Sequence, residues 1–345
     1  MAMADATAPG ARPRYVEERP IGPAELDIAL KAASQPFVAR GFANDWPLVK
    51  AGVESGGACA RAYLLSHARD RRFEVNVGTP GQGARLFYDE QMAMNFQMGR
   101  ASLADIFSGI EANLERPDAP AIYLSSLEMR DYFDDDLHRA NHAELSGRQS
   151  RDSIWIGTRT RIAAHNDIPH NLAVCAVGRR RFTLFPPESF ADLYLGPLEN
   201  TPAGRAVSMV DISDPDLDRY PRFIEAAATG LVAELEPGDA LFIPSMWYHN
   251  VEALDGFNVL INHWWRETPR FLGDPEQALL HAILAVRDLP PEARERWKAL
   301  FDHYVFSGGK AAAAHLPEGK RGILDPLNAE SAGRLRAFLL RALSQ

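Results

Sequence analysis

Two short segments carry side chains whose types and spacing suit metal binding: His165-Asn166-Asp167 and, later in the chain, His249. Residues i and i+2 of an extended segment share a face, so the imidazole of His165 and the carboxylate of Asp167 can bind one ion. A His-x-Asp pair is common by chance, and an isolated strand histidine is more often structural than a ligand. The pair is therefore informative only if the fold supplies a third ligand.

His249 is the candidate for that third ligand. It follows Glu236-Pro237-Gly238-Asp239 and Pro244 in a segment that reads as a strand. Two imidazoles and one carboxylate on one side of a metal leave positions open for a co-substrate and O2. This arrangement suits non-haem Fe(II), whereas a closed four-ligand site suits structural zinc. We therefore expect His165, Asp167 and His249 to hold an Fe(II) that activates O2.

The segments around these residues predict a β-structure that can bring distant strands together. From Ala121 onwards the chain consists of short β-type runs, most of them punctuated by Gly, Pro or Asp. The runs are AIYLSS, SIWIG, RTRIAA, NLAVCAVG, RRFTLFPP, LVAELEPGDALFIP, WYHNVEA and GFNVLINHWW. Many short strands at this density indicate a sandwich or barrel, and a double-stranded β-helix of the cupin or jelly-roll type fits.

The remaining segments predict a mainly β protein with additions at both ends. We expect a flexible tail over 1–15, an N-terminal α/β decoration packed on the barrel over 16–120, the catalytic barrel over 121–270, and helices over 271–345. Asp131–Asp136 and Pro197–Tyr220 are predicted to be loops. The C-terminal helices either pack on the barrel or form a homodimer.

The composition limits the class of protein. The 345 residues are 46% hydrophobic and 24% charged, with a formal net charge of −9, which indicates a folded core and does not favour a nucleic-acid backbone as partner. The only cysteines, Cys59 and Cys175, suggest no disulfide framework, so a reducing cytoplasm is expected. No apolar run is long enough to predict a membrane span or a secretion signal.

The ordered motifs resemble a known family, the cupin-like Jumonji C hydroxylases, which include the asparaginyl hydroxylase of the hypoxia response. The resemblance covers about Ile154–Trp265, and PFVARGFANDWPLV resembles the family's opening strand and turn. Its motifs are His165-Asn166-Asp167, Asn171, the run from Gly178 to Pro187, the run from Pro237 to Pro244, Trp247-Tyr248-His249 and Asn262-His263-Trp264-Trp265.

The resemblance implies a double-stranded β-helix, Fe(II), O2 and 2-oxoglutarate as co-substrate. It implies His165, Asp167 and His249 as ligands, with Asn171 and Asn262 placed to contact the co-substrate. Arg180 stands where similar enzymes usually have a lysine for the distal carboxylate. Arginine can bind a carboxylate through two parallel hydrogen bonds, but its planar guanidinium is longer and less adaptable than the ammonium group of lysine.

Strand alternation is used to decide which arginine of the Arg179-Arg180-Arg181 run faces the apolar side of the strand. Arg180 has the same parity as Phe182 and Leu184, which places a cation on an otherwise apolar face.

Several other residues near the motifs are predicted to be structural. Tyr123 and Thr183 are better candidates for the core than for the site, and His170 for a polar loop. His263 alternates away from Asn262, so we expect it to face outwards and not to bind the metal. Trp247 and Trp264 are expected to pack around the iron cavity, and Cys175 to be a small buried hydrophobic residue in a strand.

Taken together, these features predict an Fe(II)- and 2-oxoglutarate-dependent oxygenase that hydroxylates a C–H bond, with a protein or peptide side chain favoured over RNA or a small molecule. Two alternatives stay open: a metal-dependent cupin enzyme that does not use 2-oxoglutarate, and a non-enzymatic cupin binding module.

Overall fold

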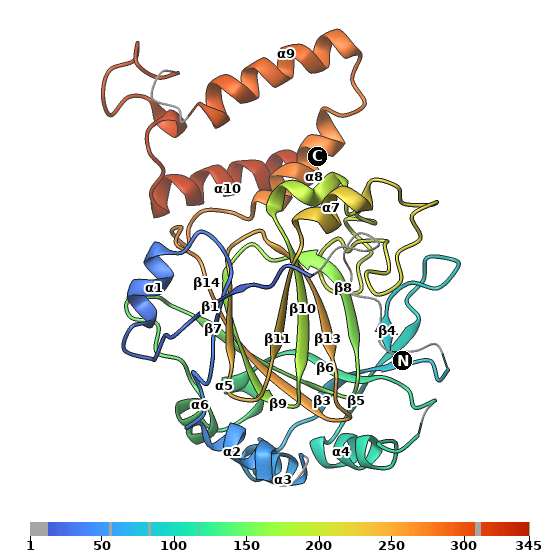
Figure 1. The fold of residues 1–345 in the computed structure, drawn as a ribbon. Helices are drawn as coiled ribbons and strands as arrows, with labels where there is room; N and C mark the ends of the chain where they lie inside the picture. Colours follow the sequence, from blue (N-terminus) through green and yellow to red (C-terminus); the bar gives the residue numbers. More distant parts are fainter. Residues whose placement is uncertain (1–12, 55–56, 82–83, 117, 308–311, 345) are drawn as a thin grey trace. The chain divides into compact units, whose positions relative to one another are not determined.

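The computed structural model describes residues 13–54, 57–81, 84–116, 118–307 and 312–344 (Figure 1). The chain forms two compact units, the first ending at Arg266 and the second beginning at Glu267. Most of the tail expected over 1–15 lies outside the described residues. At its end, the carbonyl of Arg14 accepts a hydrogen bond from the amide of Val232 at 2.7 Å.

A barrel of two facing sheets forms the centre of the first unit. Consecutive strands alternate between the sheets, except that β10 and β11 are neighbours in the same sheet: β12-β9-β14-β7 lie side by side in one sheet, and β11-β10-β13-β8 in the other. This alternation is the double-stranded β-helix that the short strands predicted, so the expected fold class is confirmed. The strands are β7 (Arg151–Gly157), β8 (Arg161–Asn166), β9 (His170–Val177), β10 (Arg180–Phe185), β11 (Leu231–Leu235), β12 (Ala240–Ile243), β13 (Tyr248–Ala253) and β14 (Asn258–Trp265).

Strand alternation divides the barrel's side chains into two cores. On β9, Ala173 and Cys175 face the barrel interior, while Leu172 and Val174 face the outer helices. The interior is closed by a packed apolar set: Phe182, Leu184, Ala233, Leu235, Leu241, Ile243, Trp247, Val251 and Leu260. The interior is therefore dry except where polar side chains are placed among these residues.

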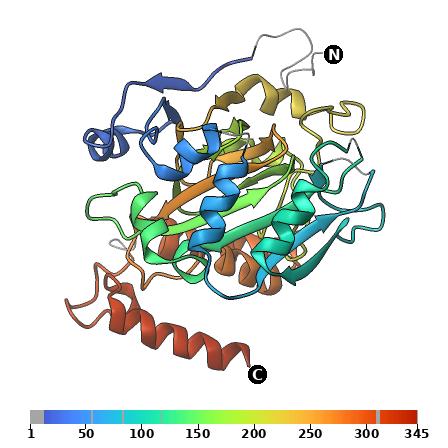
Figure 2. The same cartoon turned by 90° about the horizontal axis from the view of Figure 1, so that it is seen from below.

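The N-terminal half extends the sheets and covers one of them, in agreement with the expected α/β decoration. Added strands are β1 (Glu17–Arg19), β2 (Phe37–Ala39), β3 (Phe73–Gly78), β4 (Arg85–Leu86), β5 (Phe96–Ala101) and β6 (Ile122–Glu128), giving sheets of nine and five strands in the described residues. Helices α1 (Leu26–Ala32), α2 (Pro47–Glu54), α3 (Ala58–His67) and α4 (Leu103–Glu111) pack on the outer face of the larger sheet (Figure 2).

The prediction of a loop over Asp131–Asp136 was wrong. Residues here form two short helices, α5 (Met129–Tyr132) and α6 (Asp135–Ala140). The carboxylate of Asp134 accepts a hydrogen bond from the amide of Leu137, so the acidic residues cap α6 rather than keep the segment open. The insert 197–220 contains no regular helix or strand among its described residues, as expected. It is preceded by the 3-10 turn η1 (Pro187–Ala191) and followed by the unpredicted α7 (Phe223–Thr229).

The second unit contains the helices expected after residue 271. They are α8 (Pro275–Ala285), α9 (Pro291–Phe301), the π-turn η2 (Asp302–Phe306), the short 3-10 turn η3 (Gly322–Leu324) and α10 (Ala329–Leu343). Within the described residues of α8 and α9, no side chain is buried. Among the described residues of the whole chain, no helix is both long and apolar enough to cross a membrane.

Candidate metal centre

His165 owes its direction to a β-bulge in β8. On β13, His249 and Val251 are two residues apart and share a face, but their register partners on β8, His165 and Ile162, are three residues apart. The extra residue lies at Ala163–Ala164. Without it His165 and Ile162 would point to opposite faces; with it both face the barrel interior. The bulge therefore places the imidazole of His165 opposite that of His249.

The two histidines are held in the tautomer that leaves Nε2 free for a metal. His165 Nδ1–H donates to the carbonyl of Ala163 at 2.9 Å, and His249 Nδ1–H donates to the carbonyl of Trp247 at 3.2 Å. His249 Nε2 lies 3.7 Å from Asp167 Oδ2, and one ligand atom from each of the three residues lies within 4.8 Å of the others. Hydrogen bonds of this kind commonly orient metal-binding histidines.

Burial also keeps one of these imidazoles neutral. Desolvation lowers the pKa of His249 to about 4, the neighbouring His165 lowers it further, and Asp167 acts in the opposite direction. A neutral imidazole offers a lone pair, whereas an imidazolium does not, so His249 is ready to bind a cation at pH 7.

The turn before β13 holds the loop that carries Asp167. The amide of Met246 donates to the carbonyl of Asp167 at 2.8 Å, and the hydroxyl of Ser245 donates to the carbonyl of Ile168 at 2.5 Å. Met246 has a φ of 68°, an unusual value for a residue other than glycine. The loop and the turn therefore support each other next to the three candidate ligands.

Polar atoms without partners line the barrel beyond the ligands. Asn171 on β9 and Asn262 on β14 both face the interior, and the Oδ1 atom of each is buried with no hydrogen-bond partner. The same is true of Ser153 Oγ, Trp155 Nε1 and Trp264 Nε1. Buried polar atoms are nearly always satisfied in folded proteins, so this set fits a polar ligand inside the barrel.

Arg180 is the most unusual residue of this interior. It has the parity of Phe182 and Leu184, and only 2% of it is exposed. Its Nε has no hydrogen-bond partner, and burial lowers its pKa, with Tyr123 and Cys175 as the groups that oppose this shift. The flanking arginines face outwards and pair with carboxylates: Arg179 with Asp255, and Arg181 with Glu234.

A family model described as a cupin-like domain matches residues 23–271, well over half of the chain. This chain belongs to the cupin-like family of Jumonji C type. The match includes the whole barrel, the N-terminal decoration apart from β1, and all the candidate site residues.

Named relatives are similar to a shorter part of the cupin-like chain. The tRNA wybutosine-synthesizing protein 5 of Danio rerio is 34% identical over 146 residues, 38% of this chain and 42% of that protein. The HSPB1-associated protein 1 of Homo sapiens is 33% identical over 146 residues, which are 40% of this chain and 28% of that protein. The lysine-specific demethylase JMJ31 of Arabidopsis thaliana is 32% identical over 115 residues, which are 33% of this chain and 20% of that protein. The alignments thus span less than half of each of these relatives.

Four residues considered from the sequence take structural positions in the cupin-like barrel. Tyr123 is buried beside Trp155, with ring centroids 5.9 Å apart, and burial raises its pKa. Thr183 has the opposite parity to Arg180 and so faces away from the interior. His170 is the first residue of β9 and stacks on Trp265, so the prediction of a loop position for it was wrong. Cys175 is buried, which raises its pKa to about 12.

Ser153 and Trp155 were not singled out from the sequence, although both face the barrel of the cupin-like chain. Strand alternation in SIWIG could have shown that they share a face, but not which face is inside.

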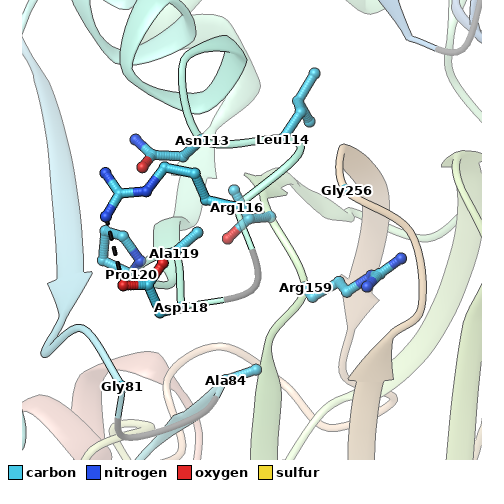
Figure 3. A pocket seen from close by; sticks show the side chains of 11 residues that line it. Gly81, Ala84, Asn113, Leu114, Arg116, Asp118, Ala119, Pro120, Arg159 and Gly256 are labelled. Atoms are coloured by element: carbon cyan, nitrogen blue, oxygen red, sulfur yellow. Dashed lines mark ion pairs between the residues drawn. The ribbon is translucent and has the colours of Figure 1, made fainter.

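The cupin-like chain also has surface hollows outside the barrel. One of about 440 Å³ is bordered by Asn113, Arg116, Asp118 and Arg159, and Arg116 pairs with Asp118 at its rim (Figure 3). None of the three candidate ligands is among the described residues that line it. This hollow therefore has no part in the candidate metal centre.

Proposed function

We propose that this protein is an Fe(II)- and 2-oxoglutarate-dependent oxygenase that hydroxylates a C–H bond. The observation that carries the proposal is Arg180, a buried cation that pairs with no carboxylate of the described residues and lies in the same barrel as two histidines and an aspartate. An unpaired buried charge is costly, so a site of this kind is built for an anion.

The spacing along β10 suits a dicarboxylate between Arg180 and the ligands. Leu184 is the register partner of His249, and Arg180 lies four residues earlier on the same strand. Four residues of strand span roughly 13 Å, a length that an arginine side chain and a five-carbon dicarboxylate together cover. Arg180 would bind the distal carboxylate through its planar fork, and the amides of Asn171 and Asn262 would orient the metal-binding end.

His165, Asp167 and His249 would hold Fe(II) from one side. Together, the bound metal and 2-oxoglutarate would supply the oxidation: 2-oxoglutarate would lose CO2 and take up one atom of O2 as it becomes succinate, and the other oxygen atom would be inserted into the substrate's C–H bond. The protein's own contribution is to orient both groups and to exclude water. Trp155 and Trp264, whose ring centroids lie 5.8 Å apart, form part of the wall that does so.

A binding experiment under anaerobic conditions tests the proposal directly. Protein loaded with Fe(II) is titrated with 2-oxoglutarate and followed by the charge-transfer absorption of the chelate, and succinate is then measured after O2 is admitted. We expect binding and slow succinate formation, both lost in His165→Ala. Fe(II) binding without affinity for 2-oxoglutarate would instead favour a metal-dependent cupin that uses another co-substrate. No metal binding at all would favour a binding module.

For the substrate we propose a protein or peptide side chain. A second hollow, of about 490 Å³, is bordered by β4, which pairs with β8, the strand of His165. Its lining includes five carboxylates and two arginines: Asp89, Glu90, Asp211, Asp214, Asp216, Arg85 and Arg219. With a net charge of −9, this surface favours a cationic peptide over an RNA backbone. The relatives include proteins named tRNA wybutosine-synthesizing protein 5 and lysine-specific demethylase JMJ31. Intact-mass screens on peptides and on tRNA, each seeking a gain of one oxygen atom, would separate the two classes.

The same proposal includes a homodimer formed by the second unit. The described residues of α8, α9 and α10 expose many large apolar side chains, among them Leu279, Leu284, Trp297, Phe338 and Leu340. Apolar surface of this extent commonly marks an interface. Light scattering should give the mass of a dimer for the full chain and of a monomer for Leu284→Glu/Phe338→Glu. A wild-type monomer would end this part of the proposal.

The cellular compartment proposed is the cytoplasm. The sequence contains only two cysteines, Cys59 and Cys175, which is too few for a disulfide framework and is typical of a reducing compartment.

A further inference from the structure

A second cluster of imidazole and carboxylate groups lies on the outer face of the larger sheet. Asp152 on β7 and His263 on β14 are register partners, and both point away from the barrel, because their neighbours Ser153 and Asn262 point into it. His138 comes from α6, and His142 follows that helix by two residues. Three imidazoles from three segments thus surround one carboxylate, of which only 4% is exposed.

The distances within the cluster give its histidines two roles. His263 orients the carboxylate of Asp152, and His138 and His142 approach one oxygen of that carboxylate. His263 Nδ1 lies 2.8 Å from Asp152 Oδ1, and its Nε2 accepts the amide of Ala143 at 3.4 Å, so Nδ1 carries the proton and donates to the carboxylate. The other oxygen, Oδ2, lies 2.7 Å from His138 Nε2 and 3.1 Å from His142 Nδ1. His263 therefore fixes the carboxylate with Oδ2 turned towards two imidazole nitrogens.

One of these nitrogens has no hydrogen bond. His142 Nδ1 is buried and makes no well-formed hydrogen bond to the described residues, although it lies 3.1 Å from Asp152 Oδ2. A buried nitrogen that lies this close to a carboxylate oxygen without a hydrogen bond fits a cation that both atoms could bind. One ligand atom from each of His138, His142 and Asp152 lies within 4.8 Å of the others. The side chain of His142 is 28% exposed although its Nδ1 is buried, so a fourth ligand would be a water molecule enclosed with the cluster.

We propose that His138 Nε2, His142 Nδ1 and Asp152 Oδ2 bind a second divalent metal ion of the Zn²⁺ class, separate from the candidate centre in the barrel. Two imidazoles and one carboxylate are ligands that Zn²⁺ accepts, and water completes a tetrahedron. The hydrogen on His138 Nε2 would move to Nδ1, so the ligand nitrogens bind as neutral imidazoles. His263 is a positioning residue, because it acts on the metal through Asp152.

The consequence of this site is a link between two layers of the fold. His138 and His142 belong to the helical layer, whereas Asp152 and His263 belong to the strands whose other face carries Ser153 and Asn262. A bound ion would tie α6 to the sheet behind the barrel wall. This role is structural, and it does not depend on which reaction the barrel performs.

Metal stoichiometry of the full chain tests this proposal. In a His165→Ala background, which weakens the barrel centre, we expect one tightly bound equivalent of Zn²⁺ by equilibrium dialysis and elemental analysis. Substitution with Co²⁺ should give the intense visible absorption of a tetrahedral site. Adding His142→Ala should abolish both, because it removes a half-buried ligand without opening the core. The matched control, His281→Ala, changes an exposed histidine of α8 and should leave both unchanged.

Two results would overturn the proposal. One is a His165→Ala protein that binds no Zn²⁺ although its circular dichroism is that of the wild type; the other is Zn²⁺ binding that survives His142→Ala. The cluster would then be a hydrogen-bonded network around a buried carboxylate. Zn²⁺ should also raise the melting temperature of the His165→Ala protein, since an ion that binds only the folded state stabilises it, and His142→Gln should remove that shift.

Discussion

His165 and His249 face each other across neighbouring antiparallel strands, with ring centroids 4.5 Å apart. The β-bulge at Ala163–Ala164 makes this possible, because it turns His165 to the side of the sheet on which His249 lies. The two imidazoles and Asp167 form the group of candidate ligands in a barrel whose interior also holds Arg180.

Replacing His165 should remove metal binding from the barrel. In His165→Ala the remaining His249 and Asp167 provide two of the three ligands, and we expect turnover to fall by more than about a hundredfold, since even outer-sphere changes at metal sites cost about 10–100-fold. Fe(II) titration and succinate formation measure this. An unchanged Fe(II) affinity would place the metal elsewhere.

Replacing Arg180 should weaken the binding of 2-oxoglutarate without changing the binding of the metal. Arg180→Met should weaken 2-oxoglutarate binding by about 10–150-fold, the equivalent of about 1.5–3 kcal/mol for hydrogen bonds to a charged group, while Fe(II) affinity is kept. Arg180→Lys restores the charge and should recover much of the affinity. Calorimetric titration with 2-oxoglutarate compares the variants, and equal affinities in Arg180→Met and wild type would refute the role of Arg180.

The metal-free protein should lose stability on acidification because of His249. Its folded-state pKa of about 4 lies below the ordinary histidine value of about 6.5, so the unfolded chain binds a proton first. The contribution of this group to the free energy of unfolding is present above pH 6.5 and is lost as the pH falls towards 4. The shift corresponds to about 3 kcal/mol at most. Urea denaturation at a series of pH values measures it, and His249→Gln should flatten the slope in this window.

The barrel interior should carry much of the stability of the first unit. Phe182 is 1% exposed within the apolar set that closes the barrel, so Phe182→Ala should lower the free energy of unfolding by about 3–5 kcal/mol. Phe190, which is 59% exposed, offers the matched control, and Phe190→Ala should change it by less than about 0.5 kcal/mol. Equal losses in the two variants would contradict the assignment of the interior core. Urea denaturation gives both values.

Local patterns in the sequence were enough to predict much of the barrel and its candidate site. Short β-type runs, the two-residue spacing of His165 and Asp167, and the shared parity of Arg180 with Phe182 and Leu184 are properties of neighbouring residues. Strand alternation acts on such neighbours directly, which is why the inward direction of Arg180 and the outward direction of His263 could be predicted.

Other features depend on residues distant in the chain, and only the tertiary structure decided them. The bulge in β8 exists because of its pairing with β13. The contact of Asp152 with His138, His142 and His263 arises because β14 returns beside β7 beneath α6. Periodicity describes which side a residue takes along its own strand. Which strand lies next to it, and what covers that side, is set by packing across the whole sheet.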